Sequence, residues 1–283
     1  MFFAKIKKMK FKNAAVFFNE NKPNVRTLAQ DACSFLRARG LCARTVTELD
    51  GLDPSFDLLI CMGGDGAMLR CARAAAPLGT AVFGVNCGTL GFLASCEISD
   101  FKERLEQLLG GRYAAHERFM LRAQIVTPNS DVQEYLAFND CVLRALQPRA
   151  FTVNASFNGK EIPPYFGDGV IISTPTGSTA YSLAAGGPIV HPQVDVLLIT
   201  PICPHSLHQR PLILPAGGEL ELTPSFKNKD DEAILSIDGQ INLPLPDGAR
   251  VRLTRSPLKV KLLATGQRDF FSVLNRKLNW GAR

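Results

Sequence analysis

At 283 residues the chain is long enough for two domains, each with its own core. It is 46% hydrophobic and 20% charged, which is usual for a globular protein, and no apolar run approaches the roughly 20 residues that cross a bilayer. The net charge is +6, but five lysines between Lys5 and Lys12 carry most of it. Without a long apolar run we expect no membrane partner, and a basic tail without a basic face argues against a nucleic-acid partner. We expect this terminus to be frayed, with a local contact to a partner's acidic surface as the alternative.

Eight cysteines are scattered along the chain without a Cys-x-x-Cys pair, and several lie inside apolar runs. This pattern is typical of reduced thiols in a cytoplasmic protein rather than of a disulfide framework. His205 and His208 have a spacing that suits one helix face, but Pro204 and the lack of a nearby carboxylate or thiolate set argue against zinc. We therefore expect a cytoplasmic protein without a structural metal.

The first part of the chain alternates predicted strands and helices. Apolar runs predict buried strands at 14–18, 56–61 and 80–85. Helices are predicted from Asn24, as the cap, to Gly40, then at 67–76 before Pro77, and after a capping box formed by Asp100 and Glu103. This alternation predicts an α/β N-terminal domain, residues 1–115, with a doubly wound parallel sheet.

From His116 onward, short predicted strands alternate with turns. Strands are expected at 120–126, 135–143, 152–157, 170–173, 196–200, 219–223, 234–237, 251–254 and 260–263. Asn158-Gly159 and Asp247-Gly248 are hairpin-type turn sequences, and a helix at 178–185 interrupts the pattern. We expect a β-rich, antiparallel, sandwich-like C-terminal domain over 116–264 and a helical tail, 265–283, that packs back on the first domain.

Gly63-Gly64-Asp65-Gly66 lies between a predicted strand and a predicted helix. Glycines allow a close approach of a ligand to the backbone, and a helix N-terminus favours a phosphate. The carboxylate of Asp65 would repel that phosphate unless it accepts a proton from an attacking hydroxyl or helps to hold a metal ion. A plain Gly-Asp-Gly turn remains the alternative, since the sequence lacks both the Rossmann and the P-loop patterns.

A hydroxyl-rich segment runs from Thr174 to Ser182 between a predicted strand and a predicted helix. Its amides and hydroxyls can bind a nucleotide, and Tyr181 can pack on a planar ring. An ordinary hydroxyl-rich helix cap is the alternative. Asp168, in the preceding Gly-Asp-Gly sequence, could reach ribose hydroxyls or simply lie in a turn.

The adjacent Asn139 and Asp140 stand in the middle of the apolar run 135–143. If both are buried they need partners, and a carboxamide suits an adenine edge while a carboxylate suits sugar hydroxyls. A strand end or a bulge explains the pair equally well.

Together these segments resemble the NAD kinase family over roughly residues 57–283. The resemblance rests first on the Gly-Gly-Asp-Gly turn, which phosphofructokinases and lipid kinases share. It also rests on the loop 86–93 (Asn-Cys-Gly-Thr-Leu-Gly-Phe-Leu) and on Asn139-Asp140. The most specific segment is 168–181, with its Thr-Pro-Thr-Gly-Ser run. The motifs 201–207, Arg210-Pro211, Asp238-Gly239-Gln240 and Asn279-Trp280-Gly281 follow in the expected order.

The resemblance implies transfer of the ATP γ-phosphoryl group to the adenosine ribose 2′-hydroxyl of NAD, with Mg²⁺ or Mn²⁺ held mostly by phosphates and water. It implies an active site between two domains, a homodimer or homotetramer, and Asp168 acting through a neighbouring subunit. Asp65 would be the catalytic base. Gly63, Gly64 and Gly66 would approach the donor phosphates, and NAD would contact Phe92, Asn139, Asp140, Thr176, Thr179, Ala180 and Tyr181.

Three positions depart from the family pattern. Ala67 replaces a usually polar residue, Asp140 is one methylene shorter than the usual Glu, and Phe166 stands where many bacterial members have a basic residue. Two rival hypotheses stay open: a related lipid or sugar kinase, which needs no Thr-Pro-Thr-Gly-Ser segment, and a non-catalytic NAD-sensing protein, for which loss of Asp65 would be expected.

Overall fold

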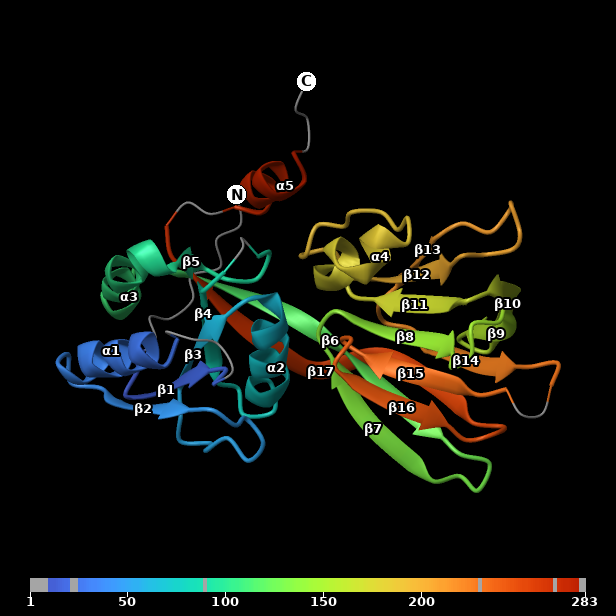
Figure 1. The fold of residues 1–283 in the computed structure, drawn as a ribbon, viewed down its shortest axis with the longest axis horizontal. Helices are drawn as coiled ribbons and strands as arrows, with labels where there is room; N and C mark the ends of the chain where they lie inside the picture. The colour runs from blue at the N-terminus through green and yellow to red at the C-terminus, as the bar shows by residue number, and fades with distance from the viewer. Residues whose placement is uncertain (1–9, 21–24, 89–90, 229–230, 267–268, 280–283) are drawn as a thin grey trace. The chain divides into compact units, whose positions relative to one another are not determined.

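A computed structural model describes residues 10–20, 25–88, 91–228, 231–266 and 269–279 (Figure 1). The chain divides into two compact units, Met1–Arg118 with Lys259–Arg283 and Phe119–Leu258. The unit boundaries fall inside the strands β6 (Ala114–Val126) and β17 (Arg250–Ala264), which connect the two units. The frayed terminus expected before residue 10, the Asn24 cap and the Trp280-Gly281 motif lie outside the described residues.

The sheet of unit 1 is parallel throughout its central strands. Its order is β17-β4-β3-β1-β2, and the short β5 pairs with β4. The strands are β1 (Asn13–Phe18), β2 (Cys42–Val46), β3 (Leu58–Gly63), β4 (Ala81–Asn86) and β5 (Cys96–Glu97). The sequence pattern did not predict β2, because this edge strand is mostly exposed and has no continuous apolar run.

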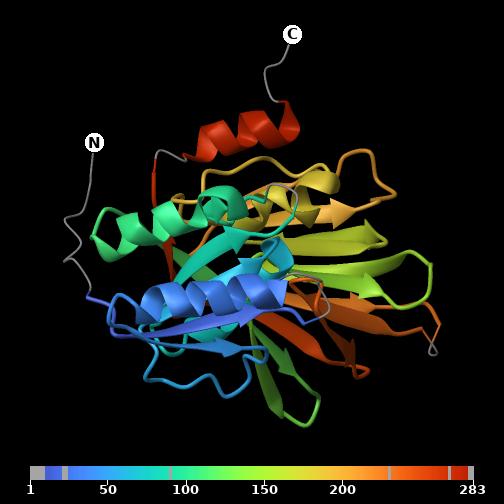
Figure 2. The same cartoon turned by 60° about the vertical axis from the view of Figure 1, so that its left-hand side comes forward.

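Helices cover both faces of this sheet. α1 (Val25–Arg37) and α3 (Phe101–Leu109) share a core with alternate residues of the strands, including Ile60 and Phe83. α2 (Asp65–Ala75) packs on the other face, where a Cβ at Gly84 would lie 2.7 Å from the sulfur of Met68. Since successive strand residues point to opposite faces, the unit is the doubly wound α/β domain that the sequence predicts; Figure 2 shows α1 in front of the strands.

One predicted helix start and one predicted capping box in unit 1 are wrong. α2 begins at Asp65, two residues before the predicted start at residue 67, so the glycine turn is itself the junction of β3 and α2. The capping box is formed by Glu97 and Asp100, not by Asp100 and Glu103, because a 3-10 turn (Ile98–Asp100) already starts before α3. Glu103 accepts a hydrogen bond from Gln107 instead.

The C-terminal tail belongs to unit 1, as expected. α5 (Phe270–Leu278) begins at Asp269, whose carboxylate accepts the amides of Phe271 and Ser272, and it buries Val273 and Leu274. Within the described ranges no helix is long and apolar enough to span a bilayer. All eight cysteines lie in the described ranges, and none of them forms a disulfide there.

Unit 2 is a sandwich of two antiparallel layers, as predicted. One layer has the order β13-β12-β11-β8-β15-β16, and the other contains β10-β9-β14, the first part of β17, β6 and β7. Their inner faces share one core, with Leu143, Ile172 and Leu235 from the first layer and Leu121 and Val153 from the second. The strands are β7 (Val132–Ala137), β8 (Asp140–Ala145), β9 (Phe151–Phe157), β10 (Lys160–Gly167), β11 (Gly169–Ser173), β12 (Val196–Ile202), β13 (Leu212–Pro215), β14 (Leu220–Ser225), β15 (Ala233–Ile237) and β16 (Ile241–Leu245).

Several predicted strands of unit 2 have different bounds. The single strand expected at 135–143 is two strands, β7 and β8, interrupted at Phe138 and Asn139 and placed in different layers. Conversely, 251–254 and 260–263 are one strand, β17, which passes through the exposed Pro257. The missed strands β10, β13 and β16 each contain proline and lie at sheet ends, where proline is tolerated.

The turns of unit 2 are only partly as predicted. Asn158-Gly159 joins β9 and β10 with φ of 50° and 75°, which confirms that hairpin. Asp247-Gly248 instead connects β16 to β17 in another sheet, and a hairpin turn lies at Asp238-Gly239, with φ of 50° and 65°. The helix expected at 178–185 is a 3-10 turn (Thr176–Thr179) followed by the short α4 (Tyr181–Ala184).

Candidate functional site

The glycine turn lies at the carboxyl end of a parallel strand, where ligands of doubly wound sheets bind. Gly63 ends β3 and Gly64 is the N-cap of α2, so the positive end of an 11-residue helix is at the turn. A Cβ on Gly63 would lie 2.6 Å from that of Ala67, whereas one on Gly64 would meet nothing within 4 Å. Gly64 therefore leaves the surface of the turn open for a ligand, and Gly66 follows Asp65 in the first helical turn.

Asp65 is held by the loop that follows β4. Its Oδ2 accepts the amide of Phe92 at 2.9 Å and its Oδ1 accepts that of Leu93 at 3.1 Å. Gly91 allows this approach, because a Cβ there would lie 2.2 Å from Oδ1. The ammonium group of Lys277 lies 3.8 Å from Oδ2 and 4.7 Å from the centre of the Phe92 ring. The structure thus brings together Asp65 and Phe92, which the sequence analysis had only placed on separate motifs.

Asn86 is a polar residue of this edge that the sequence analysis left without a role. It ends β4 beside Gly63, with 3% of its surface exposed. Its Nδ2 donates to the carbonyl of Gly88, but its buried Oδ1 has no hydrogen-bond partner among the described residues. An unpaired buried acceptor at the carboxyl edge of a sheet is available to a ligand. The sequence did contain a signal for Asn86, because it is a polar residue at the end of a run that predicts a buried strand.

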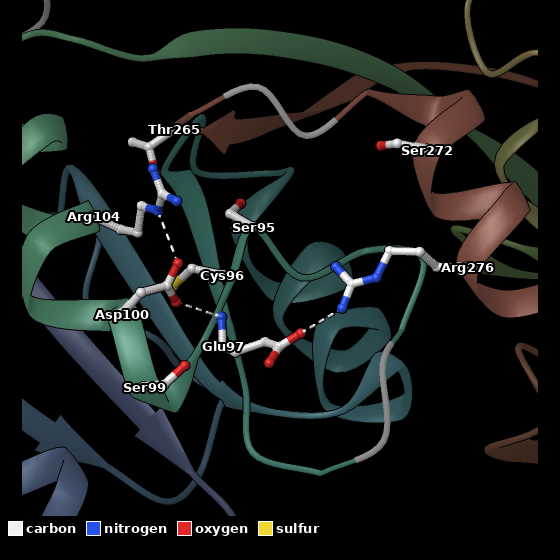
Figure 3. Close-up of a pocket in the computed structure, with 9 residues that line it drawn as sticks. All are labelled: Ser95, Cys96, Glu97, Ser99, Asp100, Arg104, Thr265, Ser272 and Arg276. Atoms are coloured by element: carbon white, nitrogen blue, oxygen red, sulfur yellow. Dashed lines mark hydrogen bonds and ion pairs between the residues drawn. The ribbon is translucent and has the colours of Figure 1, made fainter.

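A separate cavity of about 410 Å³ lies in unit 1 between β5, α3 and the C-terminal segment (Figure 3). Arg104 is bound to Asp100 at 2.9 Å and Arg276 to Glu97 at 3.4 Å, so the charges of these four side chains cancel. The buried hydroxyl of Thr265 has no partner in the described structure. The predicted site residues are not among its lining residues, which are Ser95, Cys96, Glu97, Ser99, Asp100, Arg104, Thr265, Ser272 and Arg276.

In unit 2 the break between β7 and β8 forms a polar corner around Asp238. Its carboxylate accepts the amides of Phe138 at 3.0 Å, of Asn139 at 2.7 Å and of Asp140 at 3.2 Å. These bonds replace strand pairing, which is why the predicted single strand is interrupted. The Oδ1 of Asn139 is buried and has no partner among the described residues, so it can accept a hydrogen bond from a ligand such as the adenine amine.

Asp140 is buried beside a second carboxylate. It is 5% exposed, and burial, reinforced by repulsion from Asp238, raises its pKa to about 7. Asp238, in contrast, accepts the three backbone amides of residues 138–140. In the sequence Asp238 was visible only as part of a motif, and the overlooked signal for its structural role was an Asp-Gly turn directly after a buried strand.

The hydroxyl-rich segment packs directly on this corner. A Cβ on Gly177 would lie 2.3 Å from the carbonyl oxygen of Asn139, and the Thr174 hydroxyl donates to the carbonyl of Phe138 at 2.8 Å. Thr176 is buried, while Thr179 and Ala180 are half-buried. Tyr181, the first residue of α4, is 45% exposed and offers its ring to a ligand.

Comparison with known proteins identifies the family. Residues 7–113 match the ATP-NAD kinase N-terminal domain, and residues 139–265 match the ATP-NAD kinase C-terminal domain. The chain belongs to the NAD kinase family. The NAD kinase of Geotalea daltonii is 34% identical over 96% of this chain and 100% of its own length, and that of Heliobacterium modesticaldum is 38% identical over 94% and 98%. Yeast NADH kinase complexed with NADH has the same fold, with a TM-score of 0.86 at 24% identity over 97% of this chain and 89% of its own.

Measured against the family motifs, the structure forms two clusters, one in each unit. Gly63, Gly64, Asp65, Gly66 and Phe92 lie together in unit 1. In unit 2, Asn139 and Asp140 lie together with the segment that carries Thr176, Thr179, Ala180 and Tyr181. Family membership agrees with the sequence-based identification and does not favour the lipid-kinase, sugar-kinase or sensor hypotheses.

Asp168 is not part of the unit 2 cluster. It precedes β11, whereas the hydroxyl-rich segment follows the other end of that five-residue strand, roughly 17 Å away at about 3.3 Å per residue. Asp168 is exposed, and its hydrogen bond with the Cys203 thiol raises the pKa of that thiol. Phe166, which stands where many members of the NAD kinase family are basic, is exposed and packs edge-on against His205 with ring centres 5.1 Å apart.

Proposed function

We propose that this protein is an NAD kinase that forms NADP by transferring the γ-phosphoryl group of ATP to the 2′-hydroxyl of the adenosine ribose of NAD. The observation that supports this most directly is Asp65, whose carboxylate is fixed by two backbone amides at a helix N-terminus beside a glycine turn. Asp65 takes the proton of the 2′-hydroxyl while that oxygen bonds to phosphorus. The bond between the γ-phosphorus and the bridging oxygen breaks, and ADP leaves.

The glycines of the turn and the unit 2 cluster have binding roles in this proposal. Backbone at Gly63, Gly64 and Gly66 approaches the donor phosphates, and Phe92 lies against NAD. The unpaired Oδ1 of Asn139 accepts from the adenine amine, Asp140 binds ribose hydroxyls, and Tyr181 packs on a ring of the dinucleotide. Thr176, Thr179 and Ala180 line the same segment.

A divalent cation, Mg²⁺ or Mn²⁺, neutralises phosphate charge when it is bound with ATP. Within the described part of the chain, no group of three or more His, Cys, Asp or Glu side chains could hold a metal ion. We propose that this ion is carried mainly by phosphate oxygens and water. We also propose a homo-oligomer, a dimer or a tetramer, in which the exposed Asp168 reaches the nucleotide of a neighbouring subunit; light scattering and nucleotide affinity of Asp168→Ala test this.

The test of function is formation of NADP by the purified protein from NAD, ATP and magnesium, detected with an NADP-specific dehydrogenase. Asp65→Asn should fold and bind NAD but lose about 10²–10⁴-fold in kcat, because a positioned base contributes that much. A folded Asp65→Asn enzyme with wild-type kcat contradicts the base assignment. If the wild type forms no NADP with ATP or polyphosphate, activity on diacylglycerol or a sugar phosphate indicates a related kinase, and NAD binding alone indicates a sensor.

A further inference from the structure

The last turn of α5 carries two neighbouring cations that bind different carboxylates of unit 1. Arg276 lies 3.4 Å from Glu97, and Lys277 lies 3.8 Å from Asp65. α5 is the C-terminal helix, whereas Asp65 begins α2, so only the folded tail brings Lys277 to the glycine turn. Neither the sequence motifs nor the family match assigns Lys277 a role.

Lys277 contacts two residues of the proposed transfer site at once. Its ammonium group is 3.8 Å from Asp65 Oδ2 and 4.7 Å from the centre of the Phe92 ring. Asp65 Oδ2 also accepts the Phe92 amide, so the three groups form one cluster. The side chains of Lys277 and Asp65 are 32% and 30% exposed, which leaves part of the carboxylate open to a substrate hydroxyl.

The chemistry of the site needs a cation at this place. An ionised Asp65 must accept a proton while a polyphosphate donor approaches the same turn, and the two negative groups repel each other. The amides of Phe92 and Leu93 fix the direction of the carboxylate but carry no net charge. The ammonium group of Lys277, 3.8 Å from Asp65 Oδ2, supplies that charge.

We propose that Lys277 is a positioning residue for phosphoryl transfer, which holds the Asp65 carboxylate in place and offsets its charge toward the donor phosphate. The proposal rests on the proposed function, because it requires Asp65 to be the base. Lys277 takes no part in the proton transfer. The proton of the 2′-hydroxyl passes to Asp65 as the new P–O bond forms, and ADP leaves with the electron pair of the broken bond.

Arg276 gives a matched control on the same helical turn. It has the same charge as Lys277 and also binds a carboxylate of unit 1, but its partner is Glu97 and not Asp65. Its ion pair is largely exposed, with 64% of the Arg276 side chain accessible, so little stability depends on it. Arg276→Met therefore tests whether loss of any cation from α5 is enough to slow the enzyme.

The experiment compares the full-length wild type with Lys277→Met, Lys277→Arg, Arg276→Met and Asp65→Asn in steady-state NADP formation. Lys277→Met keeps the apolar stem, and we expect its kcat to fall about 10²-fold while the KM for NAD changes little. Lys277→Arg keeps the charge and the contact with Phe92, and should recover most of the loss. Arg276→Met should stay within about twofold of the wild type in kcat.

Different outcomes separate the two proposals. A Lys277→Met enzyme with wild-type kcat, beside an inactive but folded Asp65→Asn enzyme, overturns the role of Lys277 and leaves Asp65 as the base. Equal losses in Lys277→Met and Arg276→Met, with equally lowered Tm, mean that helix docking alone matters and also overturn it. If Lys277→Arg loses as much kcat as Lys277→Met, the missing positive charge does not explain the loss, and the proposed role of Lys277 is overturned. A folded Asp65→Asn enzyme with wild-type kcat contradicts the base assignment and with it the role of Lys277, whereas a wild type that forms no NADP contradicts the proposed function itself.

Discussion

The carboxylates of Asp65 and Asp140 lie in different units and have opposite surroundings. Asp65 accepts two backbone amides, lies near the ammonium of Lys277 and is 30% exposed. Asp140 is 5% exposed and lies near the carboxylate of Asp238, which accepts the backbone amides of residues 138–140. One acid is surrounded by donors and the other by an apolar core and a like charge.

This difference teaches how the same side chain acquires two roles. A carboxylate with fixed donors and an open edge suits proton acceptance from a substrate. A carboxylate that is buried next to another changes its protonation near neutral pH, which makes it sensitive to ligands and to pH. The three predictions below disturb the two environments one at a time, beginning with the largest expected effect.

The Asp140 corner should make the stability of the free protein fall as pH rises. The folded-state pKa of about 7 lies above the usual 3.8, so the folded state binds the proton more tightly than the unfolded chain. The resulting stabilisation is fully present below about pH 4 and is lost as pH rises through 7, on the order of 4 kcal/mol at most. Unfolding midpoints between pH 4.5 and 8 measure it. Asp140→Asn should remove this component, and an unchanged pH profile in that variant would contradict the burial argument.

Gly91→Ala should disturb Asp65 without changing any charge. The new methyl carbon would lie 2.2 Å from Asp65 Oδ1, so either the carboxylate or the loop must move. A displacement of about 1 Å at a reacting group costs about 10²-fold in kcat, equivalent to about 2.7 kcal/mol.

Steady-state kinetics in two backgrounds separates this effect from general damage. If Gly91→Ala acts through Asp65, it should cost little more in an enzyme that already carries Asp65→Asn. Full additivity of the two losses would mean that the loop contributes by another route.

Asp238→Asn should loosen the corner that holds Asn139 and Asp140. All three amides donate to Oδ1, and the Phe138 amide also reaches Oδ2, so the NH₂ group of an asparagine, which replaces one of these oxygens, faces at least the Phe138 donor; a buried donor that loses its acceptor costs about 2 kcal/mol. Urea unfolding at neutral pH measures the loss. Asp247→Asn, in the exposed turn before β17, is the matched control and should stay within about 0.5 kcal/mol of the wild type.

The local pattern of the chain determined most of unit 1 and the motifs of the site. Buried apolar runs predicted β1, β3 and β4, and the glycine turn predicted the junction of β3 and α2, because strand, turn and helix start are set by neighbouring residues. Apolar runs also predicted the two layers of unit 2. The edge strands β2, β10, β13 and β16 were not predicted, because exposed or proline-containing strands lack a continuous apolar run.

What only the tertiary structure decided are the contacts between distant parts of the chain. The carboxylate of Asp238 binds an amide 100 residues earlier, and that bond breaks an apolar run that reads locally as one strand. The same holds for the amides of Phe92 and Leu93 on Asp65 and for Lys277 beside it. Motifs in the sequence identified Asp65 and Asn139-Asp140 as candidate site residues. The hydrogen-bond donors, the burial and the neighbouring charges of these residues depend on chain segments that only folding brings together.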